Sequence, residues 1–400
     1  MAASTGAFGY KPPIDTDLFY ALPPVQLAGS GTFTISIPEN CDGYQIDLIS
    51  AGGSGGAARG VGAKASGGGG SPWACIVRKK TKNATSITAI LGAGGVGVIQ
   101  TGTDGGTAGN AGASSTVSDG TITLTVPGGT AGQAVYNATT AAASANPTSN
   151  PTVSDGGLID YNLGGQSGQV LGTAILGSGA SGGAGCGGPQ GTGGSSGQVG
   201  ASVADTSIGR ASGGASINAN SGTVGAYDNT GTGGAGRFAS TSATSGSQGT
   251  DGGGTAGETA GVYNGGTMVG QYPVGDWLYM EGAASTIGSG QAGTNSTEIG
   301  IGAGSGGCGS NSASTGSSNF KGGTGGIGSN RTGAITSGKA GIFGASGGSG
   351  HGNAGSYVAT SGDAGHGCGS GGGATINAGN GVSGTGGRPF ARIQFFIRKP

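Results

Sequence analysis

Glycine recurs at every third residue along parts of this chain, and that spacing constrains the fold more than any other feature. The clearest run holds eight glycines in strict phase between residues 179 and 200, and shorter runs occur at 341–350 and 381–387. Three residues make one turn of a polyproline II helix, so each run places its glycines on one face. A bare backbone face lets neighbouring helices approach and exchange hydrogen bonds. The spacing therefore predicts a packed bundle of polyproline II helices.

Composition excludes most other folds for the glycine-rich part. Glycine makes up 103 of 400 residues, and 80 of these lie between residues 101 and 380. An α-helix is excluded because each glycine costs about 1 kcal/mol relative to alanine. Collagen is excluded because glycine falls short of one third and prolines number only 13. A disordered glycine–serine linker is the remaining alternative, and strict phasing together with 33% hydrophobic residues weakens it.

Towards both ends of the chain, apolar residues recur at every second position instead of glycine at every third. This alternation predicts half-buried strands there. Strands 73–80 and 85–91 are predicted to form a hairpin. The last strand has Ile393, Phe395 and Ile397 on one face, and comparable strands lie only in the first 126 residues, so we expect it to return to an N-terminal sheet. The predicted strands are 32–37, 44–50, 73–80, 85–91, 121–126 and 391–398.

The predicted fold class is all-β or irregular, with almost no α-helix. N- and C-terminal strands form a small β-sandwich, into which a large glycine-rich polyproline II bundle is inserted. The predicted parts are an attachment arm (1–30), a sandwich base with the first glycine-rich loops (31–130), the bundle with exposed loops (131–385) and the returning strand (386–400).

Four segments in this order resemble the glycine-rich domains of bacteriophage tail-fibre and tail-tip proteins. They are the glycine-rich stretch 51–70, the basic strand WACIVRKK (73–80), the loop LGAGGVG (91–97) and the closing ARIQFFIRKP (391–400). The middle of the chain is also similar to the glycine-rich adhesins at the long-tail-fibre tips of T-even phages. Those domains stack polyproline II helices and expose variable loops at one end. The resemblance implies a virion tail protein that acts outside the host cell and binds a surface glycan or an outer-membrane protein.

The first 30 residues match no attachment domain of that family. They carry Phe8, Tyr10, Phe19 and Tyr20 among four prolines. Prolines keep such an arm extended, and its rings need a surface to cover them. We therefore predict that this arm attaches to another tail protein or a neighbouring subunit, and a homotrimer is one arrangement that this allows. The net charge of −1 gives no reason to expect a nucleic-acid partner.

Loops must carry any binding specificity, because glycine helices present nearly identical faces. Aromatic rings are enriched in binding hot spots, and in the middle of the chain they gather within residues 258–281. A plug that caps the bundle is the alternative interpretation of the same rings. Residues 136–163, with Tyr136 and Tyr161, are the next candidate loop. The predicted receptor-contact residues are Tyr263, Tyr272, Asp276, Trp277 and Tyr279.

The sequence predicts neither a catalytic site nor a metal or cofactor site. No Walker motif is present, and Lys339 in Ser-Gly-Lys-Ala lacks the required hydroxyl neighbour. The three Gly-Cys-Gly cysteines lack paired ligand spacing. Asp276 and Glu281 lie in one loop, whereas glycoside cleavage needs two carboxyls across a groove.

A structural fibre or tail-tip component stays open as the alternative to an adhesin. A secreted ice-binding protein is disfavoured because the chain shows irregular loops and no signal peptide.

Overall fold

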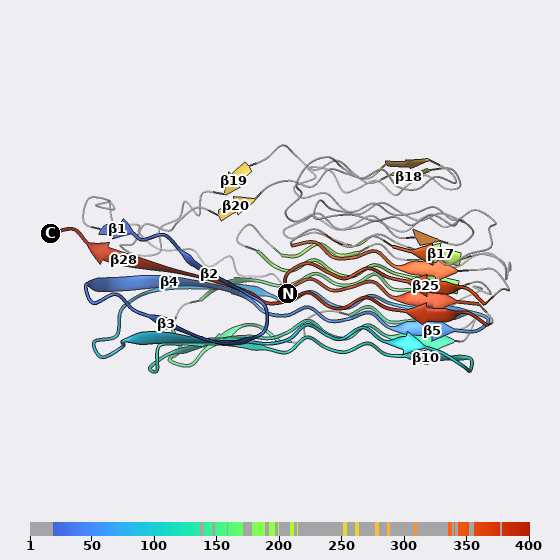
Figure 1. The fold of residues 1–400 in the computed structure, drawn as a ribbon, viewed down its shortest axis with the longest axis horizontal. Helices are drawn as coiled ribbons and strands as arrows, with labels where there is room; N and C mark the ends of the chain where they lie inside the picture. Colours follow the sequence, from blue (N-terminus) through green and yellow to red (C-terminus); the bar gives the residue numbers. More distant parts are fainter. Residues whose placement is uncertain are drawn as a thin grey trace, which may run out of the picture.

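The computed structural model describes residues 19–136 and 335–400 with short gaps, and parts of the segment 140–214. Of residues 215–334 it describes only short backbone strands. The described residues contain no α-helix, so the predicted all-β class is confirmed (Figure 1). Two packed sheets form one end of the described molecule, and stacked glycine-rich runs form the other.

The base is a β-sandwich whose two sheets share one apolar core. Inward-facing residues of both sheets, among them Tyr44, Ile46, Ile87 and Leu124, are fully buried in that core. The first sheet has the order β1-β28-β4-β7-β15, with β2 also on β28, and the second has the order β14-β12-β11-β8-β3. The strands are β1 (Phe19–Ala21), β2 (Val25–Ala28), β4 (Cys41–Ile49), β7 (Trp73–Lys79), β15 (Asp160–Asn162) and β28 (Phe390–Arg398), then β3 (Gly31–Ser36), β8 (Ser86–Leu91), β11 (Ser115–Ser118), β12 (Thr123–Val126) and β14 (Thr152–Val153).

The late strand β28 pairs antiparallel with β4 over its length, which confirms the predicted return of residues 391–398 to the N-terminal sheet. The predicted hairpin of 73–80 with 85–91 is wrong. Strand β7 pairs with β4 and β15, whereas β8 pairs with β3 and β11 in the other sheet. Both strands turn an apolar face to the same core from opposite sides, so the link between them crosses the sandwich.

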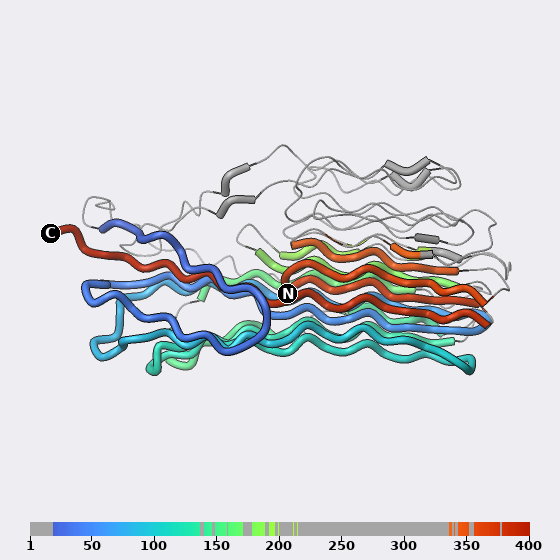
Figure 2. The backbone as a smooth tube through the Cα atoms, in the orientation of Figure 1, coloured from blue at the N-terminus to red at the C-terminus, as the bar shows by residue number. Residues whose placement is uncertain are grey.

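The glycine-rich part consists of long excursions that leave the sandwich and reverse at the far end (Figure 2). Strand β4 continues through residues 51–56, reverses after β5 and returns through residues 66–70 into β7. Short strands pair near the reversals. They are β5 (Ala57–Arg59), β6 (Ala63–Ala65), β9 (Ile99–Gln100), β10 (Gly105–Thr107), β13 (Ala134–Tyr136), β16 (Ser178–Ala180), β17 (Gly209–Ala211), β22 (Cys308–Gly309), β23 (Ile335–Thr336), β24 (Ser349–His351), β25 (Val358–Thr360), β26 (Gly373–Thr375) and β27 (Asn380–Val382). Two further pairs are β18 (Asp251–Gly253) with β21 (Thr286–Gly288), and β19 (Gly261–Tyr263) with β20 (Trp277–Tyr279).

Hydrogen bonding along the run 51–56 repeats every third residue. The amides of Gly53 and Gly56 donate to the returning strand, at the carbonyls of Gly69 and Ser66. The carbonyls of the same two glycines accept from a second neighbour, at Ser370 and Gly373. Successive residues therefore point to different neighbours, which is the threefold bonding expected of packed polyproline II helices.

Close backbone contact explains why so many of these positions are glycine. A Cβ atom built on Gly52 would lie 1.8 Å from the carbonyl oxygen of Cys368, and one on Gly53 would lie 2.0 Å from that of Thr130. A Cβ on Gly369 would lie 1.9 Å from the oxygen of Gly68. Any side chain at these positions would push two backbones apart and break the bonds between them.

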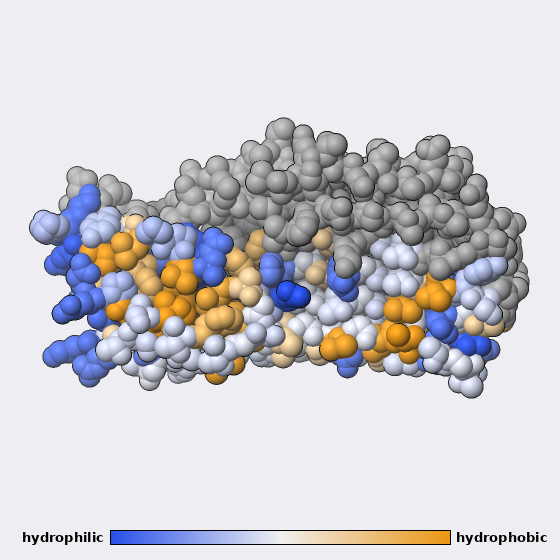
Figure 3. Space-filling model, viewed as in Figure 1, coloured by the Kyte–Doolittle hydropathy of each residue, from blue (hydrophilic) through white to orange (hydrophobic). Residues whose placement is uncertain are grey.

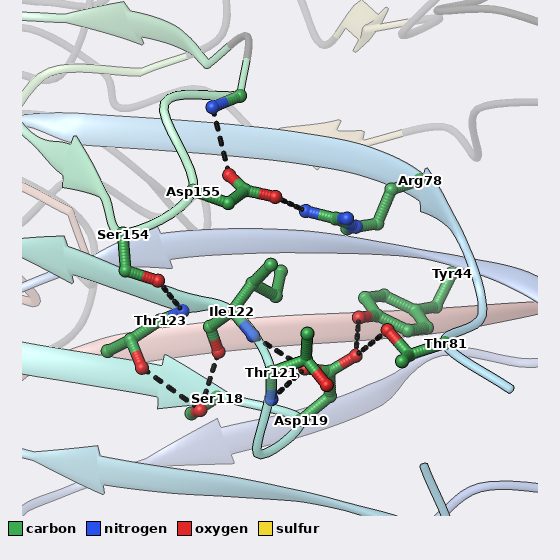
Figure 4. A network of polar contacts seen from close by, with 11 residues as sticks. Tyr44, Arg78, Thr81, Ser118, Asp119, Thr121, Ile122, Thr123, Ser154 and Asp155 are labelled. Carbon is green, nitrogen blue, oxygen red and sulfur yellow. Dashed lines mark hydrogen bonds and ion pairs between the residues drawn. The ribbon is translucent and has the colours of Figure 1, made fainter. Parts of the chain in front are cut away.

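A polar cluster ties the two sheets together at the end of the sandwich (Figure 4). The buried hydroxyl of Tyr44 on β4 donates to Asp119 at 2.7 Å, and Thr81 donates to the same carboxyl oxygen at 2.8 Å. The other oxygen of Asp119 accepts the amides of Thr121 and Ile122 at 2.9 Å each. Burial alone would raise the pKa of Asp119, but these hydrogen bonds lower it. Asp119 therefore holds the β11–β12 turn as an ionised acceptor.

Candidate functional site

The excursions reverse at the same end of the bundle, away from the sandwich, and their turns form a distal surface (Figures 1 and 2). We define this surface by the described turns at 59–63 and 101–104, by residues 376 and 378–380, and by the strand ends at Tyr136 and His351. Gly60 and Gly62 have φ angles of 115° and 75°, a region that side chains disfavour, so they allow the tight reversal around Val61. The R-G-V-G sequence thus marks one tip.

Side chains from two other excursions meet at Gly60. A Cβ atom on this glycine would lie 2.9 Å from Cβ of Asp104 and 3.1 Å from the ring of Tyr136. The guanidinium of Arg59 lies 3.8 Å from the carboxyl of Asp104. Tyr136 is 50% exposed and Val61 is 44% exposed. The cluster therefore offers a ring, an aliphatic side chain and an ion pair to a partner, a mix typical of protein contact surfaces.

A pair of rings lies at the distal ends of β24 and β25. The imidazole of His351 stacks on Tyr357, with ring centroids 5.1 Å apart and a 32° angle between planes. His351 is buried, and its carbonyl accepts bonds from the hydroxyl of Ser178 and the amide of Ile376. Tyr357 is only partly buried. The buried imidazole and its contacts position the tyrosine ring at this end.

A lysine is buried beneath the distal surface. Lys64 on β6 has no exposed surface, and its backbone pairs with Val135 and Gly179. Burial lowers the pKa of its ammonium group from 10.5 to about 8. Sequence reasoning missed this residue, although an isolated lysine within a run of Gly, Ala and Ser was a visible signal.

The predicted receptor-contact residues fall on a hairpin of which only the backbone is described. The pairing of β19 with β20 places Tyr263 opposite Trp277 and Gly261 opposite Tyr279. Tyr272 and Asp276, in the link between these strands, lie outside the described residues. The hairpin forms a two-stranded sheet of its own. The three rings on its strands thus come from one local unit.

The predicted attachment residues differ in their accessibility. Phe8 and Tyr10 lie outside the described residues. Phe19 on β1 is buried against Phe396, with the guanidinium of Arg398 5.6 Å from its ring centre. Its ring is therefore covered within the chain, a correction to the prediction that it awaits a partner. Tyr20 is 43% exposed and is accessible.

Two of the Gly-Cys-Gly cysteines meet in the interior. The amide of Cys186 donates to Sγ of Cys368 at 3.1 Å, and that thiol donates to the carbonyl of Phe343 at 3.2 Å. Burial, reinforced by Cys368, raises the pKa of the Cys186 thiol well above 9. Such thiols are inert. Within the described part of the chain, no group of three or more His, Cys, Asp or Glu residues could hold a metal ion.

The basic strand end at residues 78–82 is partly neutralised. Arg78 forms an ion pair with Asp155, and this pairing lowers the pKa of the carboxyl (Figure 4).

Among the described residues, no helix is long and apolar enough to cross a membrane. Comparisons of the chain with known protein families and with curated proteins find no match.

Proposed function

We propose that the protein is a bacteriophage tail adhesin, located in the virion, that binds a host surface receptor through loops on a glycine-rich scaffold. One observation carries this proposal. The excursions start and end in the sandwich and reverse at the opposite end, so one end can be anchored while the other is presented. The bundle between them has few side chains that could discriminate ligands, which leaves specificity to the turns.

The chemistry of the distal surface supports a surface receptor as the ligand. Tyr136 and Asp104 come from different excursions yet meet at Gly60, and Asp104 pairs with Arg59 of the turn that also exposes Val61. Rings with neighbouring charges suit sugar rings or exposed patches of an outer-membrane protein. The hairpin residues Tyr263, Trp277 and Tyr279 form a second proposed contact, together with Tyr272 and Asp276. The partner at the anchored end is another tail protein, held through the N-terminal arm. The proposed role requires neither catalysis nor a cofactor.

The experiment is adsorption of fluorescently labelled protein to a panel of bacterial strains, including strains deleted for single outer-membrane proteins or truncated in lipopolysaccharide. Binding to a defined strain, lost with one surface component, would support the proposal. A Tyr136→Ala variant should bind more weakly, and a Thr385→Ala variant, on another surface of the bundle, should bind normally. If wild-type protein binds no strain yet assembles into particles, the protein is a structural component of the tail.

A further inference from the structure

Among the described residues, one broad side of the molecule carries almost no charge. Between Lys82 and Asp155 the chain has only two charged residues, Asp104 and Asp119. Both lie in turns, at opposite ends of the molecule, and Asp119 is nearly buried. The strands and runs between these turns form the lower layer in Figures 1 and 2. Charged residues make up 8% of the whole chain, and the stretch between Lys82 and Asp155 has two in 72, so it is low in charge even for this protein.

Hydroxyl side chains form rows across the outer face of the second base sheet. In the strand pairing, Ile90 of β8 lies between Thr32 of β3 and Thr116 of β11. The same row continues through Thr125 of β12 to Thr152 of β14. The inward residues of these strands fill the sandwich core. A parallel row contains Thr34, Thr88, Ser118 and Thr123.

The same side continues along the bundle as exposed aliphatic residues at threefold spacing. Ile90 is followed by Ala93, Val96 and Ile99, all exposed, and the three larger residues are 51%, 67% and 56% exposed. On the next run Ala108, Ala111 and Ser114 are exposed with the same spacing. In Figure 3 the lower margin is mostly pale to orange. We call the sheet rows and these runs together the uncharged face.

We propose that the uncharged face binds the same face of a second copy of this chain, forming a two-fold symmetric pair. This inference is independent of the proposed function. An uncharged surface is complementary to itself, since no like charges meet across the two-fold axis. Hydroxyls both donate and accept, so rows of threonine can satisfy each other across the contact. Such a bond already exists within the face, where Thr123 donates to the hydroxyl of Ser118 at 3.0 Å.

The size of the face agrees with a pair that dissociates on dilution. Its sheet part is about 20 Å long and, with five strands spaced about 4.8 Å apart, about 20 Å wide. The two runs extend it by about 25 Å, at about 3.1 Å per residue, but make it only about 10 Å wide there. The resulting area, on the order of 600 Å² per copy, lies at the lower end of the range for specific interfaces. Two twisted sheets can pack face to face in this way at about −30°.

The test is sedimentation velocity of the purified chain over a wide concentration range. Wild-type protein should sediment as a dimer that dissociates on dilution. Lysine at Thr88 or at Val96 places two like charges across the two-fold contact, so Thr88→Lys and Val96→Lys should each weaken association at least about tenfold. A cooperative melting curve for each variant would exclude misfolding as the cause.

Gln166→Lys is the matched control, because Gln166 is exposed on a run that bonds to residues 145, 185 and 196 rather than to the runs of the face. It should leave the dimer intact. The proposal is overturned if wild-type protein is monomeric at every concentration or forms a trimer. It is equally overturned if the control dissociates the assembly as strongly as the two variants on the face.

Discussion

The amide of Gly55 donates a hydrogen bond to the hydroxyl of Ser370 at 3.1 Å, across 315 residues of sequence. The same hydroxyl donates to the carbonyl of Gly384 at 2.5 Å. A serine side chain thus bridges two neighbouring backbones where no direct bond forms. Other buried serines repeat this arrangement: Ser181 accepts from Gly67 and donates to Gly168, and Ser337 accepts from Gly362 and donates to Gly347.

Ser370→Ala should destabilise the fold, because it leaves a buried amide and a buried carbonyl without this partner. An unsatisfied buried group costs about 1–3 kcal/mol, so we expect a loss of roughly 2 kcal/mol or more in the free energy of unfolding, measured by denaturant titration. Ser114 is exposed, and Ser114→Ala should have little effect. Equal stability of the two variants would contradict the bridging role.

Gly369→Ala should also destabilise the protein, because the added Cβ would lie 1.9 Å from a backbone oxygen that has no room to move. Overpacking typically costs about 1–3 kcal/mol. Gly105→Ala is the control, since the nearest atom to its Cβ would be the flexible side-chain amide of Gln100 at 3.1 Å. Thermal melting should separate the two variants, and a Gly369 variant that melts at the wild-type temperature would argue against close packing of the runs.

Lys64 should make stability depend on pH in the alkaline range. Its folded pKa of about 8 lies below the ordinary value of 10.5. Below pH 8 the folded state therefore holds a buried ammonium at a cost of roughly 3 kcal/mol. As the pH rises from 8 to 10.5, the folded lysine loses its proton while the unfolded one keeps it, and the cost disappears.

The measurement is the stability difference between Lys64→Met and wild type at several pH values. A difference is needed because burial raises the pKa values of Cys41, Cys75 and Cys186, which lowers the stability of both proteins at alkaline pH. The advantage of the methionine variant should be largest at pH 7 and shrink towards pH 10. A constant difference would mean that Lys64 titrates normally.

A buried ion pair on the first base sheet gives a fourth prediction. Arg392 on β28 lies 3.3 Å from the carboxyl of Asp47 on β4, with side chains 5% and 1% exposed. Arg392→Leu leaves that buried carboxylate without its cation, at a typical cost of about 3–5 kcal/mol. The double variant Arg392→Leu/Asp47→Leu should recover much of this loss in denaturant titration. No recovery would mean that packing of the arginine stem, rather than its charge, stabilises the sheet.

The aromatic hairpin gives the fifth prediction, and it depends on the proposed function. Trp277→Ala and Tyr272→Ala should each weaken adsorption to bacteria about thirty-fold, since a hot-spot ring contributes about 2 kcal/mol. Each variant should melt cooperatively, like the wild type. If both adsorb normally while Tyr136→Ala does not, the distal surface binds the receptor and the hairpin is a structural plug.

Sequence periodicity predicted the base strands well because alternation reports which side chains face a core. It did not predict their partners. Strands β7 and β8 alternate alike and are close in sequence, but nothing local says that they belong to opposite sheets. The return of β28 was predictable because Ile393 and Phe395 lie on one face of a strand that needs strand partners, and comparable strands occur only in the first 126 residues.

The bundle was predictable as a packing type but not in its contacts. Period three indicated bare helix faces, but it did not indicate which runs adjoin, because glycine faces are alike. The bridging serines were missed since a serine among glycines also fits a linker. The meeting of Asp104 and Tyr136 at Gly60 depends on the relative lengths of three excursions, and no single segment encodes that.

Strand β28 lies between β1 and β4 inside the first base sheet, although it follows every other described element in the chain. During synthesis the whole bundle leaves the ribosome before this strand does. Until then, the edge of β4 that pairs with β28 has no partner strand. A chain released before residue 390 lacks an interior strand and part of the sandwich core. Only full-length chains can complete the base sheet, so we expect prematurely ended chains to be degraded by proteases.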